Sequence, residues 1–338
     1  MIHIELSDIG PKRLVYYLAM EEYLAKETSI DDAFFLWRVP PTVIFGRNQV
    51  MDAEVNLEYC KSHGVNVFRR KSGGGCVYSD LGNIMISYVT SSDNVSQAFA
   101  LYLERLCQAL RSLGVDAAPS GRNDVMIADR KVSGNAFRQL PGRSIVHGTL
   151  LYDTDFDALS RAITPSKEKI ESKGVQSVRQ RVVNLREVLP ESSGIQSVEQ
   201  LQDYIIRYFK TDSYKLSLLE CKRVEEIEQT YLDEDFLRGS NRSYSRTISG
   251  KIPDVGEIQV CISLRDNLIT GVSLGGDFFL KSDAASHDNL LSSLLEGCYP
   301  DRTSFCNRLA NVDMSEYIAG LTTPALIDLI FKQNSENQ

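Results

Sequence analysis

Three consecutive glycines between two apolar segments constrain this chain more than any other feature of its sequence. The stretch reads Arg69-Arg70-Lys71-Ser72-Gly73-Gly74-Gly75-Cys76-Val77-Tyr78, and segments 65–68 and 84–89 around it have the pattern of strands. Glycine lets a backbone approach a ligand closely, and successive backbone N–H groups can then form an anion-binding nest. Arg70 or Lys71 would supply the opposing charge. Considered alone, the stretch could equally be a flexible turn with solvated charges.

Two well-known nucleotide-binding patterns do not fit this loop. The spacing G-x-G-x-x-G is not met in the right frame, and no G-K-[ST] follows the glycines. Neither a dinucleotide fingerprint nor a Walker A loop is therefore indicated. The charge balance adds an exclusion, because 37 Lys and Arg against 45 Asp and Glu give a net charge of −8. This value disfavours a broad contact with nucleic acid but allows a small basic site.

The cysteines and histidines indicate neither a disulfide framework nor a zinc site. The seven cysteines are scattered without a C-x-x-C, and the four histidines form no pair at ligand spacing. We therefore expect reduced thiols and a cytoplasmic protein. The sequence starts MIHIELSDIG, without an apolar segment of signal length, and no run of about 18 apolar residues predicts a membrane span.

The apolar pattern predicts alternating strands and helices in the first half of the chain. Helices are expected at 11–27, 57–63, 94–113, 155–163 (N-cap Thr154) and 198–209, and strands at 34–38, 42–45, 65–68, 84–89, 125–128, 131–137 and 145–152. Segment 164–181 is polar and basic without periodicity, which predicts a long functional loop. A hairpin is expected at 257–280. The length of 338 residues and this change of pattern predict two domains, 1–245 and 246–338.

Three further stretches carry candidate chemistry, and each also has a purely structural explanation. Lys131 stands in an alternating pattern beside Ser133 and Gly134, where it can point into a cleft or merely protect an edge strand. His147 begins an apolar strand, and a lone histidine is more often a core residue than a catalyst. Segment 172–179 is either functional or a solvated surface loop.

The second of the four stretches also includes segment 121–124, ahead of 129–138. In this order, the four stretches together resemble the signatures of the lipoate–protein ligase family. The pattern R-R-x-S-G-G-G-x-V-x-x-D-x-G-N is met at 69–83, G-R-N-D at 121–124, R-K-[IV]-S-G-x-A at 130–136, H-G-T-L-L at 147–151 and K-G-[IV]-x-S-V-R at 173–179. The resemblance is strong over about residues 1–190 and weaker beyond. It implies an α/β (α+β) fold, with a large catalytic domain around a mixed β-sheet of the biotin/lipoate ligase type and a small α/β C-terminal accessory domain.

The resemblance also implies a reaction in two steps. Lipoate and ATP, with Mg²⁺, would first give lipoyl-AMP and pyrophosphate. The lipoyl group would then pass to a lysine of a lipoyl domain, in a 2-oxoacid dehydrogenase E2 subunit or in the glycine cleavage H protein. Because the first step joins two anions, the site must neutralise charge, and Lys131 would bridge the carboxylate and the α-phosphate.

Matched position by position, the resemblance implies which residues bind each substrate. Lys131 is expected to be catalytic, and Asp124, with Asn123, to help place Mg²⁺. The ATP or adenylate site is expected to contain Arg70, Gly75, Cys76, Val77, Tyr78, Lys131, Lys173, Ser177 and Arg179. The lipoate site is expected to contain Arg70, Ser72, Gly73, Gly74, Gly75, Lys131, Ser133, Gly134, His147 and Gly148. The loop at 173–179 would cover the adenylate and exclude water.

Departures from the family pattern leave two alternatives open. Cys76 stands where alanine is commoner, Ser79 where histidine is commoner, and Tyr17 where asparagine is usual. Cys76 would permit an ATP-independent lipoyl or octanoyl transferase that acts through a thioester. Such enzymes are expected to carry their cysteine in the region between Cys107 and Cys221, where this chain has none. The second alternative is a non-catalytic lipoyl-binding protein with the same fold.

Overall fold

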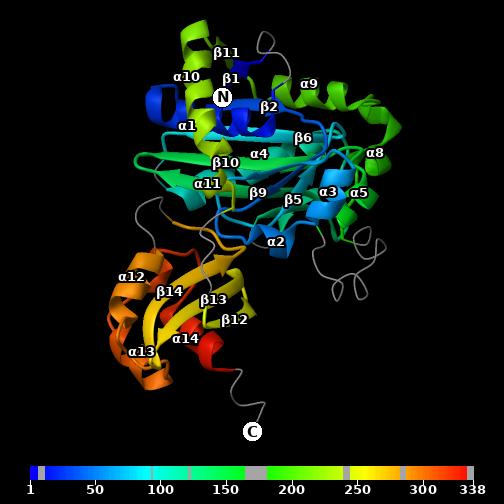
Figure 1. Ribbon diagram of the computed structural model, residues 1–338. Helices are drawn as coiled ribbons and strands as arrows, with labels where there is room; N and C mark the ends of the chain where they lie inside the picture. Colours follow the sequence, from blue (N-terminus) through cyan, green and yellow to red (C-terminus); the bar gives the residue numbers. More distant parts are fainter. Residues whose placement is uncertain are drawn as a thin grey trace.

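The computed structural model describes residues 1–6, 12–92, 94–120, 123–163, 181–238, 244–281 and 287–332. They form a larger unit and, below it in Figure 1, a smaller unit coloured yellow to red. No helix in these ranges is long and apolar enough to cross a bilayer. All seven cysteines lie within them and none is paired in a disulfide, as their spacing predicts.

A mixed sheet of eight strands forms the centre of the larger unit, as expected. Its order is β11-β1-β2-β6-β10-β9-β8-β7. Strand β1 pairs in parallel with β11 and β2, whereas the other neighbours are antiparallel. The strands are β1 (Ile2–Glu5), β2 (Ala33–Trp37), β6 (Asn83–Thr90), β7 (Ala117–Ser120), β8 (Asp124–Ile127), β9 (Arg130–Leu140), β10 (Arg143–Leu151) and β11 (Asp212–Lys215).

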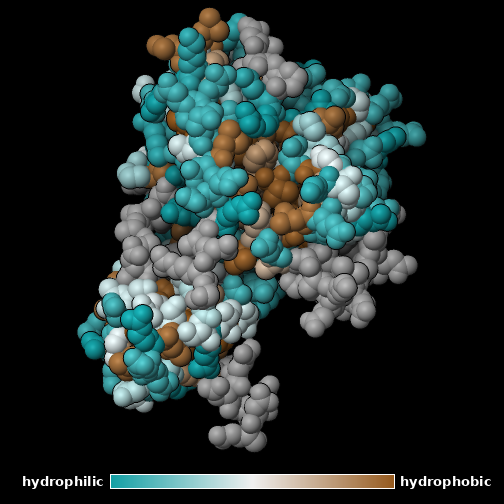
Figure 2. Space-filling model, viewed as in Figure 1, coloured by the Kyte–Doolittle hydropathy of each residue, from teal (hydrophilic) through white to brown (hydrophobic). Residues whose placement is uncertain are grey.

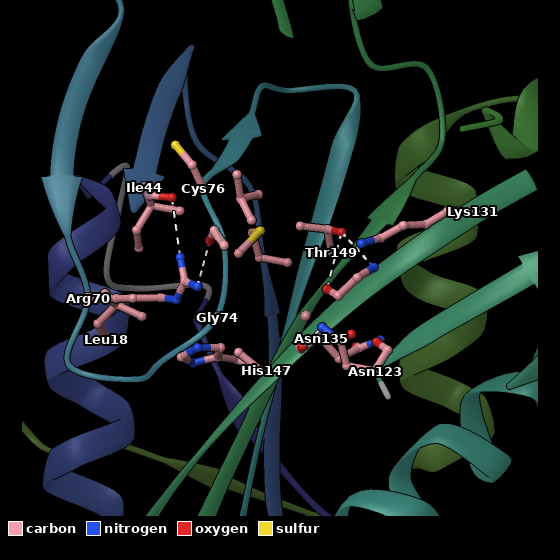
Figure 3. A pocket seen from close by; sticks show the side chains of 16 residues that line it. Leu18, Ile44, Arg70, Gly74, Cys76, Asn123, Lys131, Asn135, His147 and Thr149 are labelled. Atoms are coloured by element: carbon pink, nitrogen blue, oxygen red, sulfur yellow. Dashed lines mark hydrogen bonds between the residues drawn. The ribbon is translucent and has the colours of Figure 1, made fainter. Parts of the chain in front are cut away.

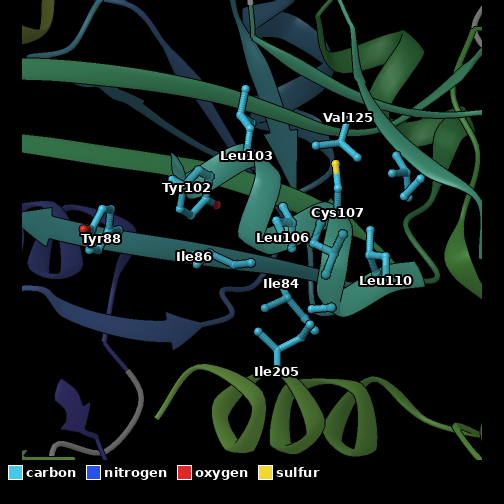
Figure 4. Packing of buried hydrophobic residues seen from close by; sticks show 14 of the residues in the cluster. Ile84, Ile86, Tyr88, Tyr102, Leu103, Leu106, Cys107, Leu110, Val125 and Ile205 are labelled. Atoms are coloured by element: carbon cyan, nitrogen blue, oxygen red, sulfur yellow. The ribbon is translucent and has the colours of Figure 1, made fainter. Parts of the chain in front are cut away.

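Helices cover both faces of this sheet because its central strands carry apolar side chains on both sides. In β2, Phe34 and Leu36 join the core beneath helices α4 (Val95–Ser112) and α9 (Val198–Phe209). The alternate residues of β2 face α1 (Leu14–Glu27) and α10 (Leu218–Leu232). Figure 4 shows the first of these cores, with side chains of α4 and α9 meeting strand β6. This alternation is the period of two of a strand that is buried on both faces.

A second, three-stranded sheet holds the glycine-rich segment. Strand β3 (Thr42–Phe45) pairs in parallel with β4 (Asn66–Arg69) and antiparallel with β5 (Val77–Ser79). Residues 70–76, here called the glycine loop, connect β4 to β5 and reverse the chain. Short helices lie around this sheet and after it: α2 (Met51–Glu54), α3 (Leu57–Ser62), α5 (Phe156–Ala162), α8 (Leu185–Val188), the 3-10 helix η1 (Glu191–Ser193) and α11 (Glu234–Arg238).

The smaller unit has its own sheet and its own apolar core. Its elements are β12 (Arg246–Ile252), β13 (Gly256–Arg265), β14 (Leu268–Gly276), α12 (His287–Leu295), α13 (Arg302–Arg308), the 3-10 helix η2 (Met314–Glu316) and α14 (Thr323–Lys332). Asp266 and Asn267 form the turn of the predicted hairpin with φ of 52° and 61°, the positive values that a two-residue type I′ turn requires. The domain boundary at 245/246 stays a prediction.

Several elements differ from the sequence expectation. Strands β1, β5, β7, β11 and β12 were not expected, and all of them except β12 have only three or four residues. Helix α5 is capped by Asp155, not by Thr154, because the Asp155 carboxylate accepts hydrogen bonds from the N–H groups of Asp157 and Ala158. Of the expected functional loop at 164–181, only Arg181 lies within the described residues.

Candidate active site

A cavity of about 100 Å³ opens between the glycine loop, helix α1 and strands β9 and β10 (Figure 3). On the molecular surface, the broadest apolar area in Figure 2 lies on the larger unit, in the part where Figure 1 draws β9 and β10. The cavity combines apolar walls with a few polar groups, as small-molecule sites do. Its lining residues are Leu18, Ile44, Arg70, Gly74, Gly75, Cys76, Val77, Met85, Asn123, Lys131, Gly134, Asn135, Ala136, His147, Gly148 and Thr149.

The cavity brings together residues from most of the matched motifs. The expected site residues that line it are Arg70, Gly74, Gly75, Cys76, Val77, Asn123, Lys131, Gly134, His147 and Gly148. The expected residues Ser72, Gly73, Tyr78, Ser133 and Asp124 do not line it but adjoin those that do. Tyr78 packs its side chain in a core beside β3, so only its backbone can take part. Gly121, Arg122, Lys173, Ser177 and Arg179 lie outside the described residues.

Six lining residues were not selected from the sequence: Leu18, Ile44, Met85, Asn135, Ala136 and Thr149. The first three are ordinary apolar residues without any chemical signal. Asn135 and Thr149 lie inside matched motifs, and this location could have marked them as site residues. Asn135 fits against Gly148 so closely that a Cβ on Gly148 would lie 1.8 Å from its Oδ1. The glycine of the H-G-T-L-L motif is therefore needed for close packing.

Arg70 braces the glycine loop from within. Its side chain is buried, and its Nη2 donates to the carbonyl oxygens of Gly73 and Gly75, at 2.7 Å each. Nη1 donates to Ile44 O at 3.3 Å, and Nε donates to Ser72 Oγ at 3.1 Å. Burial lowers the pKa of Arg70 to about 10, so the guanidinium remains charged at neutral pH. All three nitrogens of Arg70 therefore donate hydrogen bonds to atoms of the protein itself. The expected contact of Arg70 with substrate stays a prediction.

The smaller unit packs directly on the glycine loop. Gly74 N–H donates to Phe278 O at 3.1 Å, and a Cβ on Gly73 would lie 2.2 Å from the same oxygen. The Phe279 ring stacks on Phe137, with ring centroids 4.9 Å apart. One amide of the expected anion nest is thus bonded to the smaller unit in this structure. No signal in the sequence predicts this contact.

Lys131 reaches the cavity edge from β9 and forms an ion pair with Asp124 of β8. Its Nζ lies 2.7 Å from Asp124 Oδ1, and the two side chains are 35% and 32% exposed. The pairing of β8 with β9 shifts between Val125 and Met126, an irregularity of the kind that re-aims a side chain. A Cβ on Gly134 would lie 2.5 Å from Lys131 Nζ. Gly134 therefore leaves the space that the lysine occupies.

Cys76 lines the cavity, but its thiol is poorly suited to nucleophilic catalysis. Burial raises the pKa of this thiol well above its ordinary value, and the nearby charge of Arg70 offsets only part of this effect. The thiolate is the nucleophilic form of cysteine. Cys76 therefore stays protonated near neutral pH, which disfavours a thioester mechanism.

Comparison with known proteins matches both units to one family. The family described as "Lipoyl protein ligase A/B catalytic domain" matches residues 14–210, and the family described as "Bacterial lipoate protein ligase C-terminus" matches residues 241–330. The lipoate-protein ligase LplJ of Bacillus subtilis is 34% identical over 341 residues, which covers 98% of this chain and 100% of that protein. This chain belongs to the lipoate–protein ligase family. The family and the enzyme class that the motifs imply are thereby confirmed.

Further relatives agree with this membership. Lipoate–protein ligase 1 of Staphylococcus aureus is 33% identical over 317 residues, covering 93% of this chain and 95% of the relative. The solved structure of P. falciparum LipL1 in complex with lipoate shares the fold at a TM-score of 0.73 and 20% identity, over 96% of this chain and 97% of that one. The fold class is thereby confirmed.

Two other solved structures match the larger part of the chain. A lipoate-protein ligase A bound with ATP has a TM-score of 0.60 and 26% identity, over 70% of this chain and 98% of that one. A bipartite lipoate protein ligase from Thermoplasma acidophilum, described with its E2 lipoyl domain, has a TM-score of 0.61 and 29% identity, over 70% of this chain and 96% of that one.

Proposed function

We propose that this protein activates lipoate with ATP to lipoyl-AMP and then transfers the lipoyl group to a specific lysine of lipoyl domains. The observation that carries the proposal is the placement of Lys131 and the glycine loop on one cavity that also has an apolar wall. The lysine supplies a positive charge where two anions must meet, and the apolar wall suits the dithiolane end of lipoate. Family membership with ligases on both units supports the same reaction.

In the first step, the carboxylate of lipoate attacks the α-phosphorus of ATP and pyrophosphate leaves. The ammonium of Lys131 would contact both the carboxylate and an α-phosphate oxygen, and would stabilise the charge that builds up between them. Its present partner is Asp124, at 2.7 Å, so substrate binding would exchange one carboxylate for another. The backbone of the glycine loop, braced by Arg70, would hold the nucleotide.

The residues present fit a Mg²⁺ ion that is shared with the nucleotide. Asp124 provides one carboxylate at the cavity edge beside Asn123, and the described residues contain no group of three or more acidic, His or Cys side chains that would form a metal site alone. Mg²⁺ is commonly held by one or two carboxylates together with substrate phosphates. Asp124 would hold the ion, which would neutralise phosphate charge.

The acceptor would be a lipoyl domain, of a 2-oxoacid dehydrogenase E2 subunit or of the glycine cleavage H protein. The archaeal relative described with its E2 lipoyl domain supports this partner class. Transfer joins the lysine ε-amine to the lipoyl carbonyl, releases AMP and leaves one proton to be taken up by solvent or buffer. A cytoplasmic location stays a prediction from the reduced cysteines.

The test is intact-mass analysis of an apo lipoyl domain that has been incubated with the protein, Mg²⁺ and lipoate, with and without ATP. A lipoyl mass gain that requires ATP would support the ligase. Transfer without ATP, and only from an acylated donor protein, would instead establish a transferase. The absence of modification under both conditions would favour a binding protein and contradict the proposal.

Replacement of Cys76 separates the ligase from the transferase more directly. We expect Cys76→Ala to keep ATP-dependent lipoylation, because the half-buried thiol has a raised pKa and takes no part in the proposed chemistry. For the same reason, alkylation of Cys76 at pH 8 should be slower than that of the exposed Cys306. Loss of lipoylation in the folded Cys76→Ala variant would restore the thioester mechanism.

Replacement of Gly134 tests the space that Lys131 needs. In Gly134→Ala, the new methyl group would meet the flexible end of the lysine, so we expect normal folding but a displaced ammonium. Lipoate-driven ATP–pyrophosphate exchange should fall roughly 10- to 100-fold, which is the rate loss expected when a catalytic group is misplaced. The control is Gly271→Ala in strand β14, where a Cβ has no neighbour nearer than 3.8 Å. Equal exchange rates in the two variants would sink this role of Gly134.

A further inference from the structure

A buried hydrogen-bonded chain runs from helix α1 to the glycine loop beneath the cavity. Glu21, which is 3% exposed, has its Oε2 2.8 Å from His147 Nδ1. The other ring nitrogen, Nε2, lies 2.8 Å from Ser72 Oγ. Ser72 Oγ in turn lies 3.1 Å from Arg70 Nε, the group that braces the loop. The chain therefore connects a carboxylate of α1 with the loop expected to hold the nucleotide.

At the α1 end, the direction of the hydrogen bonds follows from an indole. Trp37 Nε1 lies 2.9 Å from Ser87 Oγ, and an indole N–H can only donate. Ser87 therefore accepts from Trp37 and turns its own hydrogen toward Glu21 Oε1, 2.5 Å away. Glu21 thus accepts a hydrogen bond on Oε1, and its second oxygen, Oε2, faces His147 Nδ1.

At the loop end, the guanidinium of Arg70 is a group that can only donate, as the indole of Trp37 is at the α1 end. Ser72 Oγ therefore accepts from Arg70 Nε. Ser72 is 3% exposed, and within the described residues the other partner of its Oγ is His147 Nε2, so the buried hydroxyl hydrogen is satisfied only if Nε2 accepts it. The imidazole then accepts at Nε2 and carries its hydrogen at Nδ1, where Glu21 accepts it. The two ends therefore agree on one tautomer of His147, with hydrogen on Nδ1 and none on Nε2.

We propose that Glu21 is a positioning residue for adenylation, which fixes His147 as the Nδ1–H tautomer and thereby orients Ser72, Arg70 and the glycine loop. The order of the groups is that of a Ser-His-acid triad. Ser72, however, is 3% exposed and does not line the cavity, so it is not placed as a nucleophile. The chain ends instead on Arg70, whose Nη2 holds the carbonyls of Gly73 and Gly75.

The first test reads the wild-type protein and needs no measurement of activity. The ¹⁵N spectrum of histidine-labelled protein distinguishes protonated from unprotonated ring nitrogens, and the His147→Gln variant assigns the signal among the four histidines. We expect His147 to have a protonated Nδ1 and an unprotonated Nε2. A protonated Nε2, whether alone or with Nδ1, would overturn the proposal. This result stands even if the proposed ligase reaction is absent, so the two failures are distinguishable.

The second test measures adenylation and therefore rests on the proposed function. We expect Glu21→Gln to change the His147 signal and to lower kcat/KM for lipoate-driven ATP–pyrophosphate exchange about 10- to 100-fold, the effect of losing a hydrogen bond to a charged group. The matched control is Glu22→Gln, the adjacent buried carboxylate, whose partners are Lys26, Lys71, Arg138 and the hydroxyl of Tyr231. This control should leave the His147 tautomer unchanged.

A double-mutant cycle separates positioning from general damage to α1. If Glu21 acts through Ser72, then Glu21→Gln should cost little in a Ser72→Ala background, because the connection is already broken. Additive losses in kcat/KM would show that Glu21 acts by another route and would overturn the proposal. If Glu21→Gln does not fold, the tautomer of His147 in the wild-type protein still tests the proposal. Hydrogen on Nε2 would contradict the proposed chain of hydrogen bonds.

Discussion

Replacement of Lys131 by alanine or leucine should abolish most adenylate formation while the protein stays folded. Lys131 supplies the positive charge at the cavity edge where lipoate and the α-phosphate are proposed to meet. Loss of one such group in a prepared site costs about 10²- to 10³-fold in rate. The measurement is lipoate-driven ATP–pyrophosphate exchange. Stability should change by less than about 1 kcal/mol, because the Lys131–Asp124 pair is one-third exposed.

The control for Lys131 is its neighbour on the same strand. Arg130 is 37% exposed, and its ion pair with Glu187 is long, at 4.0 Å. Because side chains alternate along β9, Arg130 points to the face of the sheet opposite to that of Lys131. Arg130→Ala should keep nearly wild-type exchange. If the folded Lys131 variants also retained exchange, the central role assigned to this lysine would be refuted.

Replacement of Arg70 by lysine should have the largest effect on stability. The guanidinium satisfies carbonyl oxygens of Ile44, Gly73 and Gly75 in a buried site, and a single ammonium cannot reach all of them. We expect a loss of about 3 kcal/mol in the free energy of unfolding, in the range for disrupted buried charges. Urea denaturation followed by the fluorescence of Trp37, the single tryptophan, reports on the larger unit.

An exposed arginine provides the comparison for Arg70. Arg186, with a side chain 64% exposed, pairs with Asp153 at the surface. Arg186→Lys should change the free energy of unfolding by no more than about 0.5 kcal/mol. A loss of less than about 1 kcal/mol in Arg70→Lys would mean that the loop does not depend on the guanidinium fork.

Local patterns predicted most of the long elements but missed the 15-residue helix α10 and most of the short strands. Helix α4 begins after the N-cap Asn94, whose side chain accepts a hydrogen bond from the N–H of Gln97, and it ends before Gly114, which has a φ of 85°. Local residue types therefore mark both ends of this helix. Strand β11 has no such signal. It consists of Asp212–Lys215 and pairs with β1, roughly 210 residues earlier, so the partner and not its own residues makes it a strand.

The candidate site was predicted where motifs mark it and missed where distant segments complete it. Lys131, His147 and the glycine loop carry recognisable patterns, and the fold brings them to one cavity. Glu21 and Phe278 carry none. Each reaches the loop region from an element far away in sequence, one through a histidine and the other through a backbone carbonyl. Long-range packing of this kind leaves no trace in local spacing.

The sequence by itself determined the family, the chemistry and the motif residues of this protein, because charged groups and glycines at fixed spacing are local properties of the chain. Tertiary structure decided how these groups are held. It turned Arg70 inward onto loop carbonyls and paired Lys131 with Asp124. It also shielded Cys76 partly from water, which raises the pKa of its thiol and makes it a poor nucleophile near neutral pH. These outcomes depend on which donors and acceptors meet once water is excluded, and only the packed fold fixes that.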